Sequence, residues 1–242
     1  MKRKGFTLIE LLVVIAIISL LMAILIPALA RARKQAKALI CQAKLKQWGL
    51  VFYFYMEDNR GNFTEYLGGR WMNPFKPYYN DEKEMLYCPM ATRAETEGGT
   101  NPYAAWGNGS SGSYVINEWL FYVDPASNPG GSRPSTWYWR NIHVKGTRNI
   151  PIIMDGAFRG EGQPFSSDEP PLVENMPRST MGDDEMRIFC INRHDGEVNG
   201  LFMDWSARPV GLKGLWKLKW HRMYDINDDE PVWPRWMINI GY

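Results

Sequence analysis

The sequence predicts an α+β chain in which a long N-terminal helix, first membrane-spanning and then amphipathic, packs on a C-terminal antiparallel β-sheet domain. Three observations predict this class: an apolar N-terminal segment, apolar residues at helical spacing after it, and later segments rich in β-branched and aromatic residues between turn formers. The expected divisions are a short basic segment over 1–5, the helix over 6–58 and a β-rich globular domain over 59–242.

Length and charge limit the class of protein. With 242 residues the chain has room for one medium-sized domain besides the helix. The formal net charge is +2, and the excess disappears without Lys2, Arg3 and Lys4. A surface that follows nucleic-acid phosphates needs clustered, uncompensated Lys and Arg, so no nucleic-acid partner is expected.

The long helix begins with a segment that can cross a membrane. Leu11 to Ile26 contains sixteen residues, of which only Ser19 is polar. A helix from Phe6 to Ile26 is about 31 Å long, enough for the hydrocarbon core of a bilayer. Glu10 is unusual there, because an ionisable group inside such a span is costly unless it is paired. We therefore expect the Glu10 carboxylate to have a partner.

The residues around Glu10 resemble a known processing signal. Gly5-Phe6-Thr7-Leu8-Ile9-Glu10 is similar to the cleavage and methylation motif of type IV prepilins, which type IV pilin-like proteins share with type II secretion pseudopilins. The resemblance implies that a prepilin peptidase removes residues 1–5 as a leader, cutting between Gly5 and Phe6, and that Phe6 is then methylated. It also implies that Glu10 neutralises the amino terminus of a neighbouring subunit, and that Pro27 bends the helix.

The same resemblance implies where the protein works. Before assembly it is expected to be a single-pass protein of the bacterial inner membrane, in contact with lipid and with its N-terminus in the cytoplasm. Afterwards it is expected in a filament in the periplasm or at the cell surface. The expected partners are other pilin-like subunits, the prepilin peptidase, and the inner-membrane assembly platform with its ATPase. Counting basic residues after the span favours the opposite orientation, but those residues belong to a continuing helix rather than to a loop.

Two other interpretations of the N-terminal segment stay open. Ala28-Leu29-Ala30 fits the cleavage site of a secretory signal peptide. Against it, the apolar stretch is longer than the usual ~7–15 residues, and Glu10 has no purpose in such a peptide. A plain signal anchor tolerates Glu10 close to the membrane interface. The number of matching motif positions favours the prepilin interpretation.

Beyond Pro27, apolar residues are spaced as on one face of a helix that ends near Met56. They are Leu29, Ala32, Ala36, Leu39, Ile40, Ala43, Leu50, Tyr53 and Phe54. We expect this stripe to pack on the C-terminal domain, while the basic face of the helix meets neighbouring subunits or lipid headgroups.

The remainder of the chain is predicted as loops followed by strands. Residues 59–112 lack a long period, which indicates loops with short helices. The expected strands, rich in Val, Ile, Phe, Tyr or Trp, cover 113–123, 150–155, 186–192 and 198–204. The Pro-rich segment 160–182 is predicted as a surface loop. Residues 213–222 are predicted as a short helix or strand on the core.

A second resemblance involves the last expected strands. His194 and Asp204 are separated by nine residues, as in the H-x9-D-G signature of a prepilin-associated family, but Trp205 replaces the final glycine. Residues 149–156 also resemble strand-to-turn stretches of that family. We expect His194 and Asp204 to form a structural hydrogen bond between neighbouring strands. Catalysis would also need a nucleophile and an oxyanion site, and the sequence offers neither in recognisable form.

The three cysteines are expected to be structural. Cys41, Cys88 and Cys190 allow one disulfide and one free thiol in an exported chain, with all three pairings open. Metal binding is the weaker interpretation, because the spacing matches no zinc motif.

No cofactor is expected, with calcium as the candidate exception. Asp225, Asn227, Asp228, Asp229 and Glu230 offer oxygen ligands near the C-terminus, and some pseudopilins hold calcium in a C-terminal loop. The spacing matches no defined calcium loop, so a solvated acidic turn is the stronger interpretation.

The sequence therefore predicts a non-enzymatic structural subunit, a pseudopilin, of a type II secretion or type IV pilus-like filament. The alternative is a surface-displayed carbohydrate-binding protein that uses the same export signal, with Trp216 or Trp220 stacking on sugar rings. A third hypothesis is a tethered hydrolase that uses His194 and Asp204.

Overall fold

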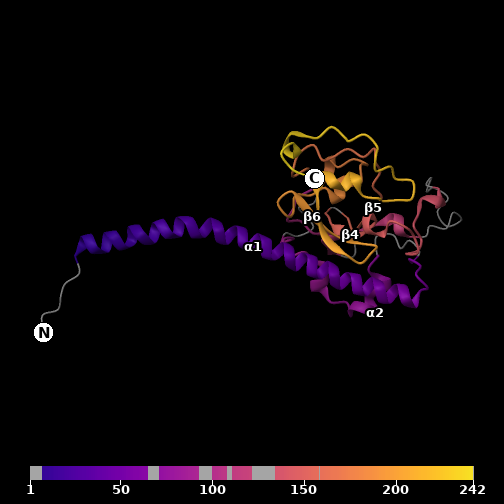
Figure 1. Ribbon diagram of the computed structural model, residues 1–242, viewed down its shortest axis with the longest axis horizontal. Helices are drawn as coiled ribbons and strands as arrows, with labels where there is room; N and C mark the ends of the chain where they lie inside the picture. Colours follow the sequence, from indigo (N-terminus) through magenta and orange to yellow (C-terminus); the bar gives the residue numbers. More distant parts are fainter. Residues whose placement is uncertain are drawn as a thin grey trace. The chain divides into compact units, whose positions relative to one another are not determined.

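The computed structural model describes residues 7–64, 71–92, 100–107, 111–121, 134–157 and 159–241. Helix α1 (Leu8–Asp58) is the longest element. Tertiary contacts divide the chain into two compact units, Met1–Lys37 and Ala38–Tyr242. The first unit holds the N-terminal part of α1, and the second holds the C-terminal part of α1 together with the sheet (Figure 1).

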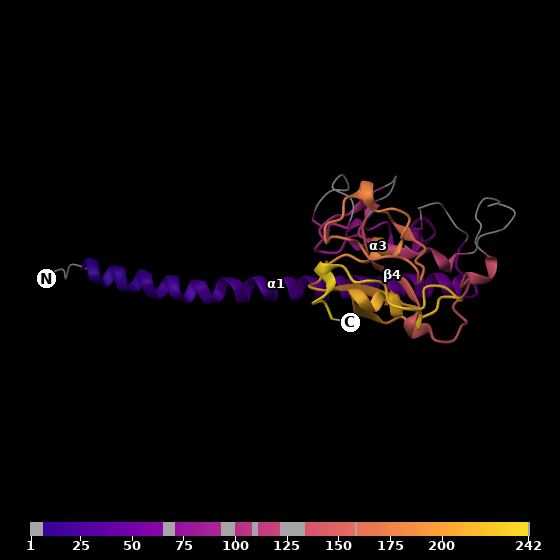
Figure 2. The same ribbon diagram turned by 90° about the horizontal axis from the view of Figure 1, so that it is seen from above.

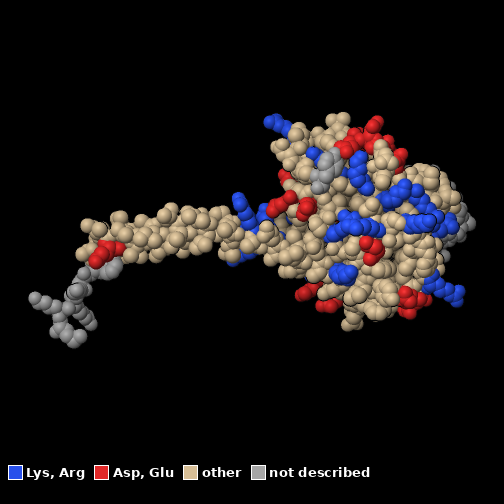
Figure 3. Space-filling view, viewed as in Figure 1, with Lys and Arg blue, Asp and Glu red and all other residues tan. Residues whose placement is uncertain are grey.

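The N-terminal part of α1 exposes apolar side chains all round. Every residue from Leu8 to Ala36 is exposed, and the visible face carries an acidic group at its start and then no charge until the basic residues that follow the apolar segment (Figure 3). By length and composition, α1 can cross a membrane. Such a surface is stable in lipid or against other helices rather than in water.

A five-stranded sheet forms the centre of the second unit, in the order β5-β3-β4-β6-β7. Its strands are β3 (Tyr114–Asn117), β4 (Pro151–Asp155), β5 (Glu161–Gly162), β6 (Glu197–Phe202) and β7 (Ala207–Gly211). Neighbours pair antiparallel from β3 to β7, while β5 pairs parallel with β3. β3 and β4 are buried along their whole length, as their apolar sequences favour.

Smaller elements surround this sheet. β1 (Trp106–Gly107) and β2 (Ser111–Gly112) form a separate two-stranded sheet. Two short helices are α2 (Lys76–Tyr79) and α3 (Met186–Phe189). α3 lies next to the end of β4 (Figure 2), where the N–H of Ala157 donates to the Ile188 carbonyl over 3.0 Å. These findings confirm the predicted fold class, a long N-terminal helix with a sheet domain, although one strand pair is parallel.

The C-terminal part of α1 packs on this unit through a different face from the predicted one. The buried residues are Cys41, Leu45, Trp48, Val51, Phe52, Tyr55 and Met56. The predicted stripe instead forms an exposed apolar face, which we define as Leu39, Ile40, Ala43, Leu50, Tyr53 and Phe54. At about 100° per residue the two sets lie on opposite sides of the helix. The prediction was wrong because both sides of this helix are apolar, and spacing alone does not say which side meets the sheet.

The basic residues of this helix segment also differ from expectation. Lys44 donates to the carbonyls of Glu84 and Tyr87 over 2.7 and 3.1 Å, and Lys46 donates to the carbonyl of Trp205 over 2.7 Å. These ammonium groups therefore bind backbone oxygens of their own chain.

Two predicted segments need correction, and one strand was not predicted. Residues 186–189 form helix α3 rather than a strand, because a short apolar run is ambiguous by pattern. Segment 160–182 is no plain surface loop: it contains β5 and buries Asp168, Met176 and Met181. β7 was not predicted, and its Pro209 is tolerated because the strand lies at an edge of the sheet.

Candidate functional site

The N-terminus of α1 is closed by a reciprocal pair of side chains. The Glu10 carboxylate Oε2 accepts the backbone N–H and the hydroxyl of Thr7, both over 2.8 Å. The Thr7 Oγ1 accepts the Glu10 N–H over 3.3 Å. This is a capping box, and the T-x-x-E pattern of residues 7–10 is its signal in the sequence. Glu10 is exposed, so its carboxylate stays accessible at the start of the apolar helix.

The other candidate residues of the N-terminal segment are Gly5, Phe6 and Pro27. Gly5 and Phe6 lie outside the described residues. α1 continues through Pro27, so this proline does not end the helix.

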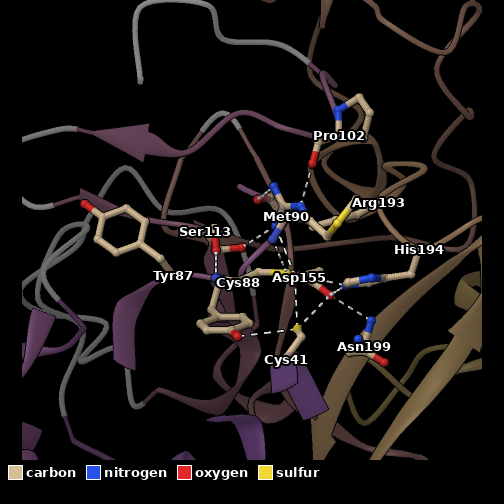
Figure 4. A network of polar contacts seen from close by, with 12 residues as sticks. Cys41, Tyr87, Cys88, Met90, Pro102, Ser113, Asp155, Arg193, His194 and Asn199 are labelled. Carbon is tan, nitrogen blue, oxygen red and sulfur yellow. Dashed lines mark hydrogen bonds and ion pairs between the residues drawn. The ribbon is translucent and has the colours of Figure 1, made fainter. Parts of the chain in front are cut away.

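A second group of chemically active side chains is buried in the unit that begins at Ala38. Cys41 comes from α1, Cys88 from the loop before β1, Asp155 from the end of β4 and His194 from the loop before β6 (Figure 4). One ligand atom from each residue lies within 4.8 Å of the other three. We call these four residues the Cys-Cys-Asp-His cluster.

Local backbone geometry helps to bring Asp155 and His194 together. Gly156 follows Asp155 where a Cβ atom would lie 2.2 Å from the Val115 side chain, so only glycine fits. The turn after His194 passes through Asp195 and Gly196 with φ of 55° and 94°, and the second of these favours glycine. The His-Asp-Gly sequence therefore serves the turn that leads into β6.

Asp155 is the centre of the cluster. Its Oδ2 lies 3.0 Å from His194 Nε2 and accepts the Asn199 N–H over 2.9 Å. Its Oδ1 pairs with Arg193 Nη1 over 3.1 Å. The two thiols complete the group: Cys41 Sγ lies 3.4 Å from Asp155 Oδ2, and Cys88 Sγ lies 3.5 Å from His194 Nε2.

Arg193 is fully buried and uses all five of its N–H donors. Besides Asp155, its guanidinium donates to four backbone carbonyls, those of Pro102, Ser113, Ala104 and Gly156. The distances are 2.7, 2.8, 2.7 and 3.1 Å, respectively. A buried charge is stable only with such complete pairing.

The charges of the cluster shift its pKa values. Burial alone raises the pKa of Asp155, but His194 and Arg193 outweigh it and lower that pKa to about 2. Burial alone lowers the pKa of His194, but Asp155 raises it to about 9. Burial alone raises the pKa of Cys88, yet contacts with Cys41 and His194 lower it to about 7. Burial raises the pKa of Cys41 well above its ordinary value.

The cluster is not arranged as a catalytic triad. In a triad the acid binds one ring nitrogen of the histidine and the nucleophile binds the other. Here Nε2 of His194 faces both Cys88 and Asp155, and Nδ1 has no hydrogen-bond partner among the described residues. The side chains of Asp155 and His194 are 0% and 3% exposed, which leaves no surface for a substrate.

The predicted bond between His194 and Asp204 does not form. His194 pairs with Asp155, 39 positions earlier, whereas Asp204 is exposed and binds the N–H and hydroxyl of Ser206. Asp155 as the partner and Arg193 as the counter-charge were not predicted from the sequence. The available signal was a single carboxylate at the end of the apolar run Pro151–Asp155.

The cysteines and the two candidate sugar-binding tryptophans are all buried. All three cysteines are free thiols, and Cys190 lies away from the cluster beside Met237, with 4.0 Å between the sulfur atoms. Trp216 and Trp220 are buried, and their indole N–H groups donate to the carbonyls of Asp168 and Leu215. They therefore present no face to a sugar.

The acidic residues near the C-terminus are exposed and support local turns. Asp225 accepts the N–H of Asn227 over 2.9 Å, and Asp228 accepts the N–H of Asp229 over 3.1 Å. Among the described residues, they are not part of the Cys, His, Asp and Glu group whose ligand atoms converge.

Comparisons with known proteins concern the N-terminal segment. A family model described as the prokaryotic N-terminal methylation motif matches residues 1–26. The type IV wide pilus major component PilA4 of Thermus thermophilus is 52% identical over 56 residues, which cover 23% of this chain and 43% of that protein. The chain thus spans less than half the length of this relative. No solved structure matches the chain. The methylation motif, this relative and the apolar helix α1 together show that the N-terminal segment of the chain is similar to that of type IV pilin-like proteins.

Proposed function

We propose that this chain is a structural, non-enzymatic subunit of a filament of the type IV pilus or type II secretion class. The observation that carries the proposal is a membrane-length apolar helix with a single carboxylate, Glu10, at its start. In the proposed maturation, a prepilin peptidase cuts after Gly5, and Phe6 becomes the methylated N-terminus. The filament would form from the bacterial inner membrane with the platform protein and ATPase of such a system.

The proposed role of Glu10 follows from the cost of a charge in an apolar environment. When α1 helices of several subunits pack together, an unpaired carboxylate among them is strongly unfavourable. The positive amino group of a processed neighbour is a partner of the right sign. Because the Glu10 carboxylate already lies at the helix N-terminus, a neighbour shifted along the helix axis brings its amino group to this level.

The exposed apolar face of α1 supports subunit packing beyond the membrane segment. Leu39, Leu50 and Phe54 are 65%, 56% and 55% exposed, although they belong to the part of α1 that is packed on the sheet through its other side. Apolar residues that stay exposed along one continuous helix face are typical of an interaction surface. In the proposal this face meets α1 of other subunits.

A charge-neutral substitution at Glu10 tests the proposal. Glu10→Gln removes the negative charge but keeps an oxygen that can accept the Thr7 hydrogen bonds, so the helix cap survives. In the native host we expect the variant to accumulate in the membrane and to be absent from sheared or isolated filaments, as followed by immunoblot and immunogold microscopy.

The matched control is Glu57→Gln, which removes an exposed carboxylate at the other end of the same helix. We expect this variant to enter filaments as the wild type does. Normal incorporation of Glu10→Gln would contradict the proposed role of Glu10.

A further inference from the structure

The Cys-Cys-Asp-His cluster has the donor set of a structural zinc site. Zinc prefers thiolate, imidazole and carboxylate ligands, whereas calcium and magnesium prefer oxygen alone. Cys41 and Cys88 supply two sulfur atoms, His194 supplies Nε2 and Asp155 supplies Oδ2. All four come from one chain, as in closed four-coordinate sites.

Three of the distances between these donor atoms are close to those of a tetrahedral site, and all four atoms lie within 4.8 Å of one another. With Zn–S bonds of about 2.3 Å and Zn–N or Zn–O bonds of about 2.0–2.1 Å, neighbouring ligand atoms are about 3.3–3.8 Å apart. The structure has 3.4 Å between Cys41 Sγ and Asp155 Oδ2, and 3.5 Å between Cys88 Sγ and His194 Nε2. His194 Nε2 and Asp155 Oδ2 are 3.0 Å apart.

Hydrogen bonds from neighbouring groups orient the two thiols and the carboxylate. Cys88 Sγ accepts the Met90 N–H over 3.5 Å, and Cys41 Sγ accepts the Tyr114 hydroxyl over 3.4 Å. Arg193 pairs with Oδ1 of Asp155, while Oδ2 accepts the Asn199 N–H and faces Cys41 Sγ. Such hydrogen bonds to metal ligands fix the direction of the ligands and tune their charge.

The charges also balance with a divalent cation. Two thiolates and one carboxylate carry three negative charges, and Arg193 with a divalent cation carries three positive charges. A buried group of this kind needs such compensation. Cys41, Cys88 and Asp155 are each 1% exposed or less, which fits a closed structural site rather than one with an open position for substrate.

We propose that Cys41, Cys88, Asp155 and His194 bind one zinc ion. The ion joins the C-terminal part of α1 to the loop that contains Cys88 and to the sheet. It thereby fixes α1 to a domain whose own contacts with that helix are confined to one face. A disulfide between Cys41 and Cys88 is the rival use of the thiols, but it gives no purpose to the contact of Asp155 with Cys41 or to that of His194 with Cys88.

The test measures metal in the full chain, purified in detergent under reducing, oxygen-free conditions and incubated with zinc before removal of free metal. We expect about one zinc ion per chain by elemental mass spectrometry. Cys88→Ser and His194→Gln should each lose most of the bound zinc. Cys190→Ser is the matched control, because it removes an equally buried thiol outside the cluster and should keep the zinc.

A second measurement does not depend on the folding of any variant. Wild-type protein loaded with cobalt instead of zinc should show thiolate-to-cobalt charge transfer and the visible bands of tetrahedral cobalt. Absence of these bands together with zinc-free wild-type protein would overturn the proposal. So would recovery of a Cys41–Cys88 disulfide peptide from protein of the native host whose free thiols are blocked at lysis without reductant, or equal loss of zinc in Cys190→Ser and Cys88→Ser. Filament assembly plays no part in these measurements, so they stand apart from the test of Glu10.

Discussion

Two buried carboxylates of this protein have opposite pKa shifts because their partners differ. Asp155 faces the cations Arg193 and His194, which lower its pKa to about 2 despite burial. Asp168 is buried as well, but among the described residues its Oδ2 accepts only the backbone N–H groups of Phe165 and Met186. Burial therefore dominates and raises the pKa of Asp168 to about 6. A hydrogen bond from an amide compensates a buried charge less than a cation does.

The shift at Asp168 predicts how stability changes with pH. Its pKa is higher in the folded chain than its ordinary 3.8, so the folded state holds the proton more tightly. Protonation of Asp168 stabilises the fold at low pH, and this contribution is lost as pH rises through about 6. Asp168→Asn lacks this dependence. Relative to the wild type, its free energy of unfolding should increase by about 1.4 kcal/mol between pH 5 and pH 8.

Urea unfolding of the full chain in mild detergent, followed by tryptophan fluorescence, measures this difference at both pH values. Asp204→Asn is the control, because Asp204 is exposed and bound only to the neighbouring Ser206. A constant difference between Asp168→Asn and the wild type at pH 5 and pH 8 would show that Asp168 does not titrate as inferred.

Single residues also show what sequence reasoning could and could not find. The carboxylate in the apolar N-terminus was visible from the sequence, because one charge directly before sixteen apolar or small residues is conspicuous. The partner of His194 was not, since Asp155 lies 39 positions away and only the pairing of β4 with β6 brings the two together. Cys41 and Cys88 likewise meet only through tertiary packing, which brings α1 next to the loop that contains Cys88.

Among the elements, β4 and β6 were predicted because each is an apolar run between turn formers, close to the observed bounds Pro151–Asp155 and Glu197–Phe202. α3 was missed because four buried residues do not distinguish a helix from a strand. β7 was missed because its Arg208 and Pro209 are unusual in a strand, and an edge position tolerates both.

Because α1 has a buried and an exposed face, substitutions of Phe52 and Phe54 should have different effects on stability. Phe52 is 0% exposed and packs against Phe75, with ring centroids 4.4 Å apart, while Phe54 is 55% exposed. Phe52→Ala should reduce the free energy of unfolding by about 3–5 kcal/mol. Phe54→Ala should change it by less than about 0.5 kcal/mol.

Thermal or urea unfolding of both variants in the same detergent provides the comparison, and each serves as the matched control for the other. In the native host, Phe54→Ala is expected to fold normally yet to enter filaments less well. Comparable destabilisation by the two substitutions would mean that the face assigned to the sheet is wrong.

The chain combines two units whose surfaces suit different environments. The N-terminal unit is an exposed apolar helix suited to lipid or to other helices. The unit from Ala38 onward has its own core, built on the sheet and the buried side of α1. The relative from Thermus thermophilus matches over only 23% of this chain, so the function of the larger unit rests on its own structure. Its buried cluster is the feature that no sequence pattern predicted.

The identity of the mature N-terminus is the most direct test of the proposed processing and assembly. Mass spectrometry of the protein isolated from membranes or filaments of its native host determines it. We expect a chain that begins at Phe6 and carries one methyl group on its amine. A chain that begins at Arg31, as cleavage after Ala30 would produce, or one that retains residues 1–5 in assembled material, would contradict this proposal.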